Sequence, residues 1–437
     1  MNKLYVVLAM LLSSSIFAQN HVPHIENPPL VPIDYRQAGF WIGRHPAPDS
    51  LIMDNDRIAR FNARAIQKGL CFSQHPDSLA IMADRLKPVI QSNFQYAKEK
   101  GRFDADGKAV SPTLWTGIEA RLNLKAYGSL SPRFAFPIRF TNQRLVPHAE
   151  ALSSTAGNIE LDYLQNSGAD IGEPTIIYHE SADGKWLFGA NHASAGWYLK
   201  QDMVILDYAD WLAFKESTDF VVTTSDKSAL YLDDSGTRYH GFIRMGNRFP
   251  LIEQSGNFFK VALPSVSPAF AYISKADANP GYLPYTARNV YQQAFKLQNA
   301  PYGWGDLNAE YDCSGLLKQL FQCFGIYLPR NGAEQAAASS LAHSFKQQDQ
   351  REQLIKTKGI AAASLLRFPG HIMLYLGSIE GRAYALHALY GYSQPSAQGD
   401  RIVKVNKTVV SDLSLGEGSA RKSLLQRLSG IYLVSIP

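Results

Sequence analysis

The chain has 437 residues, 46% of them hydrophobic, and 43 lysines and arginines against 38 acidic residues give it a formal net charge of +5. This length and apolar content suit two to four domains with buried cores. The basic residues form no cluster, which argues against dedicated nucleic-acid binding, whereas a mild positive charge would attract an anionic polymer or surface.

The chain opens with MNKLYVVLAMLLSSSIFAQN, in which one lysine precedes an apolar run from Leu4 to Leu12. Spanning a bilayer takes about twenty apolar residues, and this run has roughly nine, so residues 1–18 are predicted to be a cleaved signal peptide. No later stretch is long and apolar enough to cross a membrane. We therefore expect an exported protein without a membrane span, in the periplasm or cell envelope, with full secretion left open.

Four regions are predicted after the signal peptide. Residues 19–125 carry helical patterns with charged faces. Short alternating runs and a weak internal repeat then predict two small successive β-barrels, over residues 126–212 and 213–277. Residues 278–437 begin with a short helix, Asn289 to Leu297, and continue with a second helix and strands, the order of an α+β domain.

The chain has three cysteines, Cys71, Cys313 and Cys323. If residues 312–324 form a helix, Cys313 and Cys323 lie about 15 Å apart along its axis, beyond the ~7 Å that a disulfide can bridge. Cys71 reaches either one only through a long tertiary closure. An exported protein folds in an oxidising compartment, so at least one free thiol needs an explanation.

The stretch YDCSGLLKQLFQCFG predicts an amphipathic helix that treats its two cysteines differently. Leu316, Leu320, Cys323 and Phe324 fall on one face, so Cys323 is expected to fill the core. Cys313 instead lies at the first turn, where free N–H groups and the helix dipole favour a thiolate and lower the pKa of a thiol. That position suits a nucleophile.

A thiolate nucleophile needs a proton partner and a group that orients this partner. In the segment FPGHIMLYLGSIEGRAYALHALYGYS, His371 begins a strand that continues through residues 372–376, residues 380–381 form a turn, and His387 lies on the returning strand. If the hairpin register places both imidazoles on one face, His371 can take the proton from Cys313 while His387 holds its ring. A one-residue slip would separate them.

Six short motifs occur in order along the last region. They are Tyr302-Gly303-Trp304-Gly305, Asp312-Cys313-Ser314-Gly315, Phe324-Gly325-Ile326, Leu328-Pro329-Arg330, Gly370-His371-Ile372 and His387-Ala388. Together they resemble the NlpC-type cysteine peptidases of bacterial cell walls, and most of all the γ-D-glutamyl-L-diamino acid endopeptidases that carry two bacterial SH3-like barrels. Upstream, residues 162–167 and 196–198 resemble the first of those barrels. One departure is Asp306, which stands where a second glycine is expected.

The resemblance implies a multidomain protein with an N-terminal helical segment, two small SH3-like β-barrels and a C-terminal α+β papain-like (NlpC-type) catalytic domain. It implies a triad in which Cys313 is the nucleophile, His371 the base and His387 the polar third member. The implied partner is the peptidoglycan stem peptide, cut between the side-chain carboxyl of D-glutamate and the diamino acid.

Many relatives with the barrels accept only stems whose N-terminal L-alanine is free, and the resemblance assigns recognition of that amine to Tyr302, Asp312 and Ser314. An aspartate opposes ionisation of a neighbouring thiol by like-charge repulsion. Pairing with a substrate ammonium would use that charge and place the isopeptide carbonyl over Cys313. Helix capping by Asp312 is the competing interpretation. Tyr163 of the first barrel is expected to help wall off one end of the cleft.

Two other functions remain open from the sequence. The same scaffold could pass the acyl group to an amine or lipid, or the protein could be a non-catalytic cell-wall-binding adaptor whose barrels grip peptidoglycan. Arg330 is expected to brace the structure rather than contact substrate. We expect a monomer with no cofactor and no nucleic-acid partner, and no metal site, because no close Cys/His pairing has ligand spacing.

Overall fold

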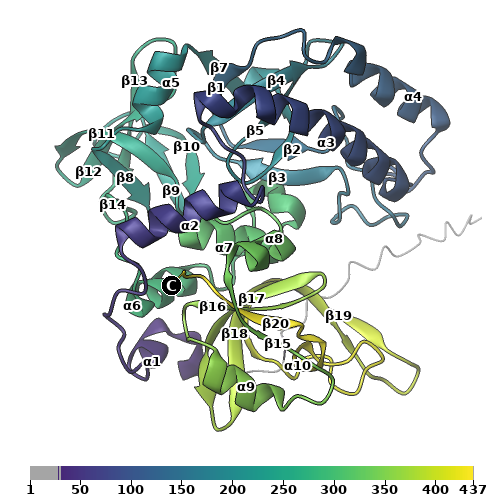
Figure 1. Ribbon diagram of the computed structural model, residues 1–437, viewed down its shortest axis with the longest axis vertical. Helices are drawn as coiled ribbons and strands as arrows, with labels where there is room; N and C mark the ends of the chain where they lie inside the picture. The colour runs from purple at the N-terminus through teal and green to yellow at the C-terminus, as the bar shows by residue number, and fades with distance from the viewer. Residues whose placement is uncertain (1–27, 29–30, 437) are drawn as a thin grey trace, which may run out of the picture.

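The structure is a computed structural model that describes residue 28 and residues 31–436. The predicted signal peptide, residues 1–18, lies outside the described residues. Among the described residues, no helix has both the length and the apolar character that a membrane span requires. The chain builds three antiparallel sheets, and helices flank them (Figure 1).

The N-terminal region is helical, as predicted, but it has no core of its own. Its elements are η1 (Ile33–Arg36), α1 (Ala38–Ile42), α2 (Asn55–Gln67), η2 (Pro76–Ser78), α3 (Leu79–Lys100), α4 (Pro112–Arg121) and η3 (Leu124–Ala126). The buried residues between Trp41 and Cys71 belong to the core of the C-terminal domain, whereas those from Met82 to Leu122 belong to the core of the first sheet. Figure 1 shows the same division, with α3 and α4 beside the first sheet and α1 beside α6.

The first sheet has seven strands in the order β3-β2-β6-β5-β4-β1-β7. These are β1 (Arg133–Pro137), β2 (Thr141–Arg144), β3 (Gln165–Ala169), β4 (Thr175–Glu180), β5 (Trp186–Ala190), β6 (Ala195–Leu199) and β7 (Met203–Leu206), with η4 (Lys200–Asp202) before β7. Large aromatic side chains, Phe188 and Trp197 among them, fill its interior together with those of α3 and α4.

Helix α5 (Tyr208–Lys215) links this sheet to a second one, ordered β10-β9-β13-β12-β11-β8-β14. Its strands are β8 (Phe220–Thr223), β9 (Lys227–Tyr231), β10 (Tyr239–Arg244), β11 (Arg248–Ser255), β12 (Phe258–Leu263), β13 (Ala269–Ser274) and β14 (Ala278–Pro280). Its small apolar core includes Val221, Phe249 and Ile273. The two sheets correspond to the two predicted SH3-like barrels.

The C-terminal region places helices before a six-stranded sheet ordered β15-β20-β16-β17-β18-β19. The helical elements are α6 (Ala287–Lys296), η5 (Trp304–Ala309), α7 (Cys313–Gln322), α8 (Gly332–Ala338), α9 (Arg351–Lys358) and α10 (Leu424–Arg427). The strands are β15 (Ser340–Ser344), β16 (Ser364–Phe368), β17 (His371–Ile379), β18 (Arg382–Gln394), β19 (Arg401–Asp412) and β20 (Gly430–Leu433). The helix predicted from Asn289 to Leu297 is α6. It begins two residues earlier and ends one residue earlier than predicted, which is the usual uncertainty of a helix end.

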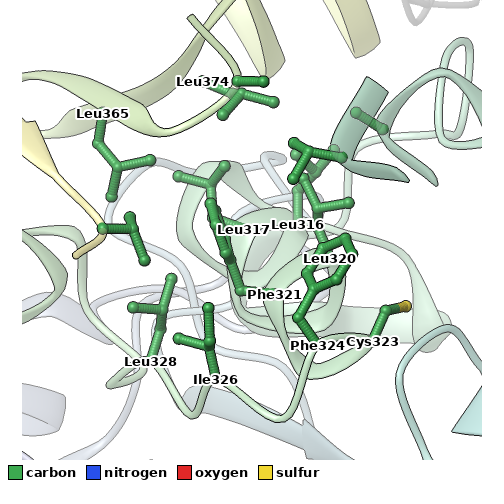
Figure 2. Packing of buried hydrophobic residues seen from close by; sticks show 14 of the residues in the cluster. Leu316, Leu317, Leu320, Phe321, Cys323, Phe324, Ile326, Leu328, Leu365 and Leu374 are labelled. Carbon is green, nitrogen blue, oxygen red and sulfur yellow. The ribbon is translucent and has the colours of Figure 1, made fainter. Parts of the chain in front are cut away.

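Helix α7 is the central element of this domain, and all of its residues after Cys313 are buried. Its apolar residues pack against Leu365 and Leu374 of the sheet and against Ile326 and Leu328 of the following loop (Figure 2). Cys323, just past the last helical residue, is fully buried in the same cluster, so its predicted role in the core is confirmed. A helix held on so many sides fixes the position of its first residue, Cys313.

The predicted fold class is confirmed: helical N-terminal segment, β-barrels and a papain-like α+β domain occur in that order. The exact domain boundaries stay predictions, and the split core of the N-terminal region shows that its helices serve two different neighbours.

Candidate active site

The N-terminus of α7 presents Cys313. Asp312 is the N-cap, and its Oδ1 accepts hydrogen bonds from the backbone N–H groups of Ser314 (3.1 Å) and Gly315 (2.7 Å). The first intrahelical hydrogen bond runs from the N–H of Leu316 to the Asp312 carbonyl. The N–H of Cys313 comes before this bond in the helix and therefore has no intrahelical acceptor. The thiol and this free N–H therefore lie together at the positive end of the helix dipole.

The pKa of the Cys313 thiol is raised to about 12, first by burial and second by the Asp312 carboxylate, although the N–H groups of Ile372 and Ser314 act in the opposite direction. The sequence predicted a lowered pKa from the helix start alone. That prediction is wrong for the free protein, because burial and the neighbouring charge outweigh the helix terminus. In the free protein, burial and Asp312 therefore favour the neutral form of the Cys313 thiol.

His371 and His387 come from one hairpin. Strands β17 and β18 are joined at Glu380 and Gly381, whose φ values of 50° and 82° lie in the left-handed region that a tight hairpin turn requires. Nε2 of His371 lies 2.8 Å from Nδ1 of His387, and Nε2 of His387 lies 2.8 Å from Oγ of Ser411 on β19. The predicted placement of both imidazoles on one face is confirmed, and Ser411 extends the chain of contacts.

Both imidazoles are held neutral. Burial and then the nearby Arg427 charge lower the pKa of His371 to about 4, and burial together with His371 lowers the pKa of His387 well below its ordinary value. A neutral imidazole carries one N–H, so Nδ1 of His371 can accept a proton only while its Nε2–H donates to His387. In that arrangement Nε2–H of His387 donates to Ser411 Oγ, and every ring nitrogen except Nδ1 of His371 has a partner.

A cavity of about 390 Å³ collects most of the predicted site residues. Cys313, His371, Tyr302, Asp312, Ser314 and Tyr163 all line it, and its remaining lining residues are Tyr96, Leu145, Gln165, Asn166, Trp304, Gly305, Arg330, Asn331, Gly332, Ala333, Arg367, Phe368, Gly370 and Ile372. His387 does not line the cavity but lies behind His371, fully buried. The contact between the Cys313 sulfur and His371 stays a prediction.

The first barrel and the N-terminal helices close one end of this cavity. The ring of Tyr163 lies 5.4 Å from that of Trp304, centroid to centroid, and Nε2 of Gln165 donates to the Gly305 carbonyl at 3.0 Å. Tyr96 of α3 also lines the cavity. The site is therefore assembled from the first barrel, α3 and the C-terminal domain.

Asp312 has a second role besides capping. Its Oδ2 accepts from Nη2 of Arg330 at 2.7 Å and from the N–H of Gly305 at 3.1 Å, while Oδ1 also accepts from Nη1 of Arg330 at 3.0 Å. Burial opposes ionisation of this carboxyl, but Arg330 outweighs it, so the pKa of Asp312 lies below its ordinary value. The capping interpretation is thus observed, and Arg330 supplies the opposite charge within the protein itself.

Asp306 explains the departure from the expected glycine. Its φ of 62° is left-handed, the reason why glycine suits this position, and aspartate tolerates it better than most residues. The fully buried carboxylate accepts from Nη2 of Arg330 at 3.0 Å and lies 3.4 Å from Nη1 of Arg244. A Cβ at Gly315 would lie only 2.0 Å from Oδ1 of Asp306, so this packing also requires the glycine after Ser314.

Arg244 connects this cluster to both barrels. It belongs to β10 of the second barrel, and its guanidinium pairs at 2.8 Å with Asp170, which directly follows β3 of the first. Asp170, Arg244, Asp306, Arg330 and Asp312 thus form a row of alternating buried charges, which we call the charge row. It runs from the barrels to Asp312, the residue beside Cys313.

Sequence reasoning missed Asp170, Arg244 and Ser411. Asp306 gave the one usable signal, since an acidic residue at a glycine position needs a cationic partner when buried. Among the described residues, no group of three His, Cys, Asp or Glu side chains is placed to hold a metal ion. All three cysteines are free.

The site thus holds a thiol at the start of a buried helix and, in the same cavity, a histidine that contacts a second histidine. Residues 299–408 match the NlpC/P60 family, and residues 150–198 match the SH3 domain of the SH3b1 type. The chain thus carries an NlpC/P60 domain behind an SH3 domain, as the motifs indicated.

Relatives agree with this assignment. The bifunctional muramidase/DL-endopeptidase CwlT of Bacillus subtilis (strain 168) is 32% identical over 99 residues, which are 20% of this chain and 26% of CwlT. The chain therefore spans only about a quarter of that relative.

Among solved structures, an NlpC/P60 endopeptidase from Photobacterium damselae subsp. piscicida aligns over 94% of this chain and 98% of its own, with a TM-score of 0.75 and 20% identity. At that identity the likeness shows the fold, which extends to the whole arrangement of domains. An NlpC/P60 family protein from Bacillus cereus ATCC 10987 aligns over 68% of this chain and 98% of its own, with a TM-score of 0.48 and 15% identity.

Proposed function

We propose that this protein is a peptidoglycan hydrolase that cleaves the γ-D-glutamyl-L-diamino acid bond of stem peptides through Cys313, His371 and His387. The observation that carries the proposal is that Cys313, at the start of α7, and His371, which contacts His387, line the same cavity. The NlpC/P60 match supports peptidase chemistry, and the DL-endopeptidase activity in the name of CwlT supports the choice of bond. Export to the envelope is part of the same proposal.

The proposed reaction uses the neutral state described above. As the thiol attacks the isopeptide carbonyl, its proton moves to Nδ1 of His371, and the carbonyl oxygen becomes an oxyanion that the N–H of Cys313 stabilises. His387 holds the ring and shares the positive charge that forms on His371. The proton then goes to the leaving amine of the diamino acid, and the thioester that remains is hydrolysed by water with His371 again as base.

Recognition of a free N-terminal amine is proposed for the end of the cavity formed by Tyr302, Asp312, Ser314 and Tyr163. Asp312 is the only acidic side chain among the residues that line the cavity. A substrate ammonium there would share a carboxylate that already pairs with Arg330. Such sharing adds a positive charge near the thiol, which would lower its pKa when substrate binds.

The test incubates the mature protein with L-Ala-γ-D-Glu-diamino acid tripeptides, containing either meso-diaminopimelate or lysine, and identifies the products by mass spectrometry. We expect L-Ala-D-Glu and the free diamino acid, no cleavage of the same peptide with an α-linked glutamate, and no product from Cys313→Ala. Wall binding without any cleavage would instead favour the adaptor, and transfer to an added amine would favour the acyltransferase.

The amine is tested with N-acetylated tripeptide against wild type and Asp312→Asn. Because Asp312 also pairs with Arg330 and caps α7, the substitution lowers activity in either case, and only the ratio of rates on free and acetylated peptide is informative. A wild-type preference for the free amine that Asp312→Asn erases supports recognition. A ratio near one in wild type contradicts it.

A further inference from the structure

The charges that line the cavity are unevenly paired. Apart from His371, its ionisable charged residues are Asp312, Arg330 and Arg367. The first two pair with each other at 2.7 Å. Arg367 has no acidic partner among the described residues. Its backbone pairs with Ile372 and Gly430 in the sheet, and its carbonyl also accepts from the N–H (2.8 Å) and Oγ (2.9 Å) of Ser429. The cavity is therefore lined by one half-buried arginine whose charge no carboxylate among the described residues pairs.

Arg367 is close to the reacting groups in the sheet. In the antiparallel register of β16 and β17 it lies directly opposite Ile372, so the two side chains leave the sheet on the same face. The N–H of Ile372 reaches the Cys313 sulfur, since it is one of the groups that lower the pKa of that thiol. The next residue pair, Phe368 and His371, also lines the cavity.

A second cation strengthens the positive character of this end. Cζ of Arg427 lies 4.0 Å from the ring centroid of Phe368, and Arg427 has no acidic partner among the residues that the structure describes. Its charge contributes to the lowered pKa of His371. Two cations without an acidic partner among the described residues thus lie near the paired residues Phe368 and His371, which suits this part of the site to an anion.

We infer that Arg367 is a specificity-determining residue that binds a substrate carboxylate next to the scissile bond. The inference rests on the proposed function. A γ-glutamyl bond uses the side-chain carboxyl of glutamate and so leaves its α-carboxylate free, and the diamino acid carries a carboxylate on the other side of the bond. Both have the planar shape that a guanidinium binds through two parallel hydrogen bonds.

The experiment measures kcat/KM of wild type, Arg367→Gln and Arg367→Lys on three tripeptides: unmodified, amidated at the D-glutamate α-carboxylate, and amidated at the diamino acid. Amidation at the recognised carboxylate should cost wild type about 10- to 100-fold, the range of a charge-assisted hydrogen bond. For Arg367→Gln, kcat/KM on the unmodified peptide should fall by the same factor. Amidation of the recognised carboxylate should then cause no further fall in kcat/KM. Arg367→Lys should retain part of the preference, because it keeps the charge without the paired donors.

Arg382→Gln is the matched control. Arg382 belongs to the same sheet but is 66% exposed, pairs with Asp412 and does not line the cavity, so this variant should keep the wild-type ratios. Wild type that cuts all three peptides equally would overturn the inference, as would Arg367→Gln that loses the same factor on every peptide. If Arg367→Gln fails to fold, the inference is still tested by the ratios of kcat/KM on the three peptides for wild type and for Arg367→Lys. Absence of any cleavage by wild type would contradict the proposed function itself, a different outcome.

Discussion

Replacing Asp306 by asparagine should destabilise the catalytic domain strongly. Asparagine keeps the size of the side chain and tolerates the φ of 62° at this position, so the loop can retain its shape. The substitution removes a single negative charge, at a fully buried carboxylate that faces Arg330 at 3.0 Å and Arg244 at 3.4 Å. Any loss of stability therefore reports the charge row rather than the backbone.

The contacts of the two arginines set the magnitude. Removing one partner of a buried ion pair costs about 3–5 kcal/mol, because the other charge stays buried. Here Arg330 keeps Asp312 at 2.7 Å and Arg244 keeps Asp170 at 2.8 Å, so neither guanidinium is left without a carboxylate. We therefore expect the lower end, about 3 kcal/mol, or roughly 10²-fold in the unfolding equilibrium.

The assay follows urea unfolding by the exposure of the buried thiol of Cys323, which lies in the core cluster of α7 and contacts the Thr223 carbonyl of the second barrel. Asp106→Asn is the matched control, because Asp106 pairs with Lys108 and both side chains are 75% exposed. This control should unfold like wild type. Overlapping unfolding curves for Asp306→Asn and wild type would refute the argument. Asp306→Gly, which places the expected glycine at this position, should show the same loss in the free energy of unfolding.

Two further predictions concern the reacting groups. Iodoacetamide should alkylate Cys313 before Cys71 and Cys323, because only Cys313 is partly exposed, and peptide mapping that finds Cys323 modified first would contradict the assignment. The kcat/KM of wild type should change little from pH 7 to about pH 5 and fall near pH 4, where His371 gains a proton and can no longer accept one from the thiol. A fall centred near pH 6.5 would show that burial does not lower the pKa of this histidine.

The hairpin that holds the two histidines was predictable because its information is local. The alternation of β17 and β18 and the turn at Glu380-Gly381 fix the register, and the register brings His371 and His387 to one face. The helix from Cys313 was predictable for the same reason, since its apolar period and its N-cap lie within a few residues of one another.

The charge state of the site was not predictable from local sequence. A helix start lowers the pKa of a thiol that water can reach, but Cys313 lies in a cavity closed by Tyr163 of the first barrel and other distant residues, and burial reverses the direction. The two partners of Arg244 are also distant in the sequence. Asp170 lies 74 residues upstream, and Asp306 belongs to another domain, so no sequence periodicity connects these positions. The unexpected acid at position 306 was noted only as a departure from glycine, although it is the one sequence feature that could have indicated a buried partner.

The charge row also changes how the barrels should be viewed. If the barrels only anchored the protein to the cell wall or bordered the cleft, their contacts with the catalytic domain would be exposed and replaceable. Arg244 and Asp170 are instead fully buried, and Nε2 of Gln319 on α7 donates to Asp170 at 3.1 Å. Separating the domains would expose or unpair charges that now neutralise one another, at a cost of several kcal/mol per buried ion. Met245 of the second barrel moreover belongs to the core cluster of α7. The barrels and the C-terminal domain therefore depend on each other for stability, and the carboxylate of Asp312 beside Cys313 keeps its geometry because residues from all three hold the same row of charges.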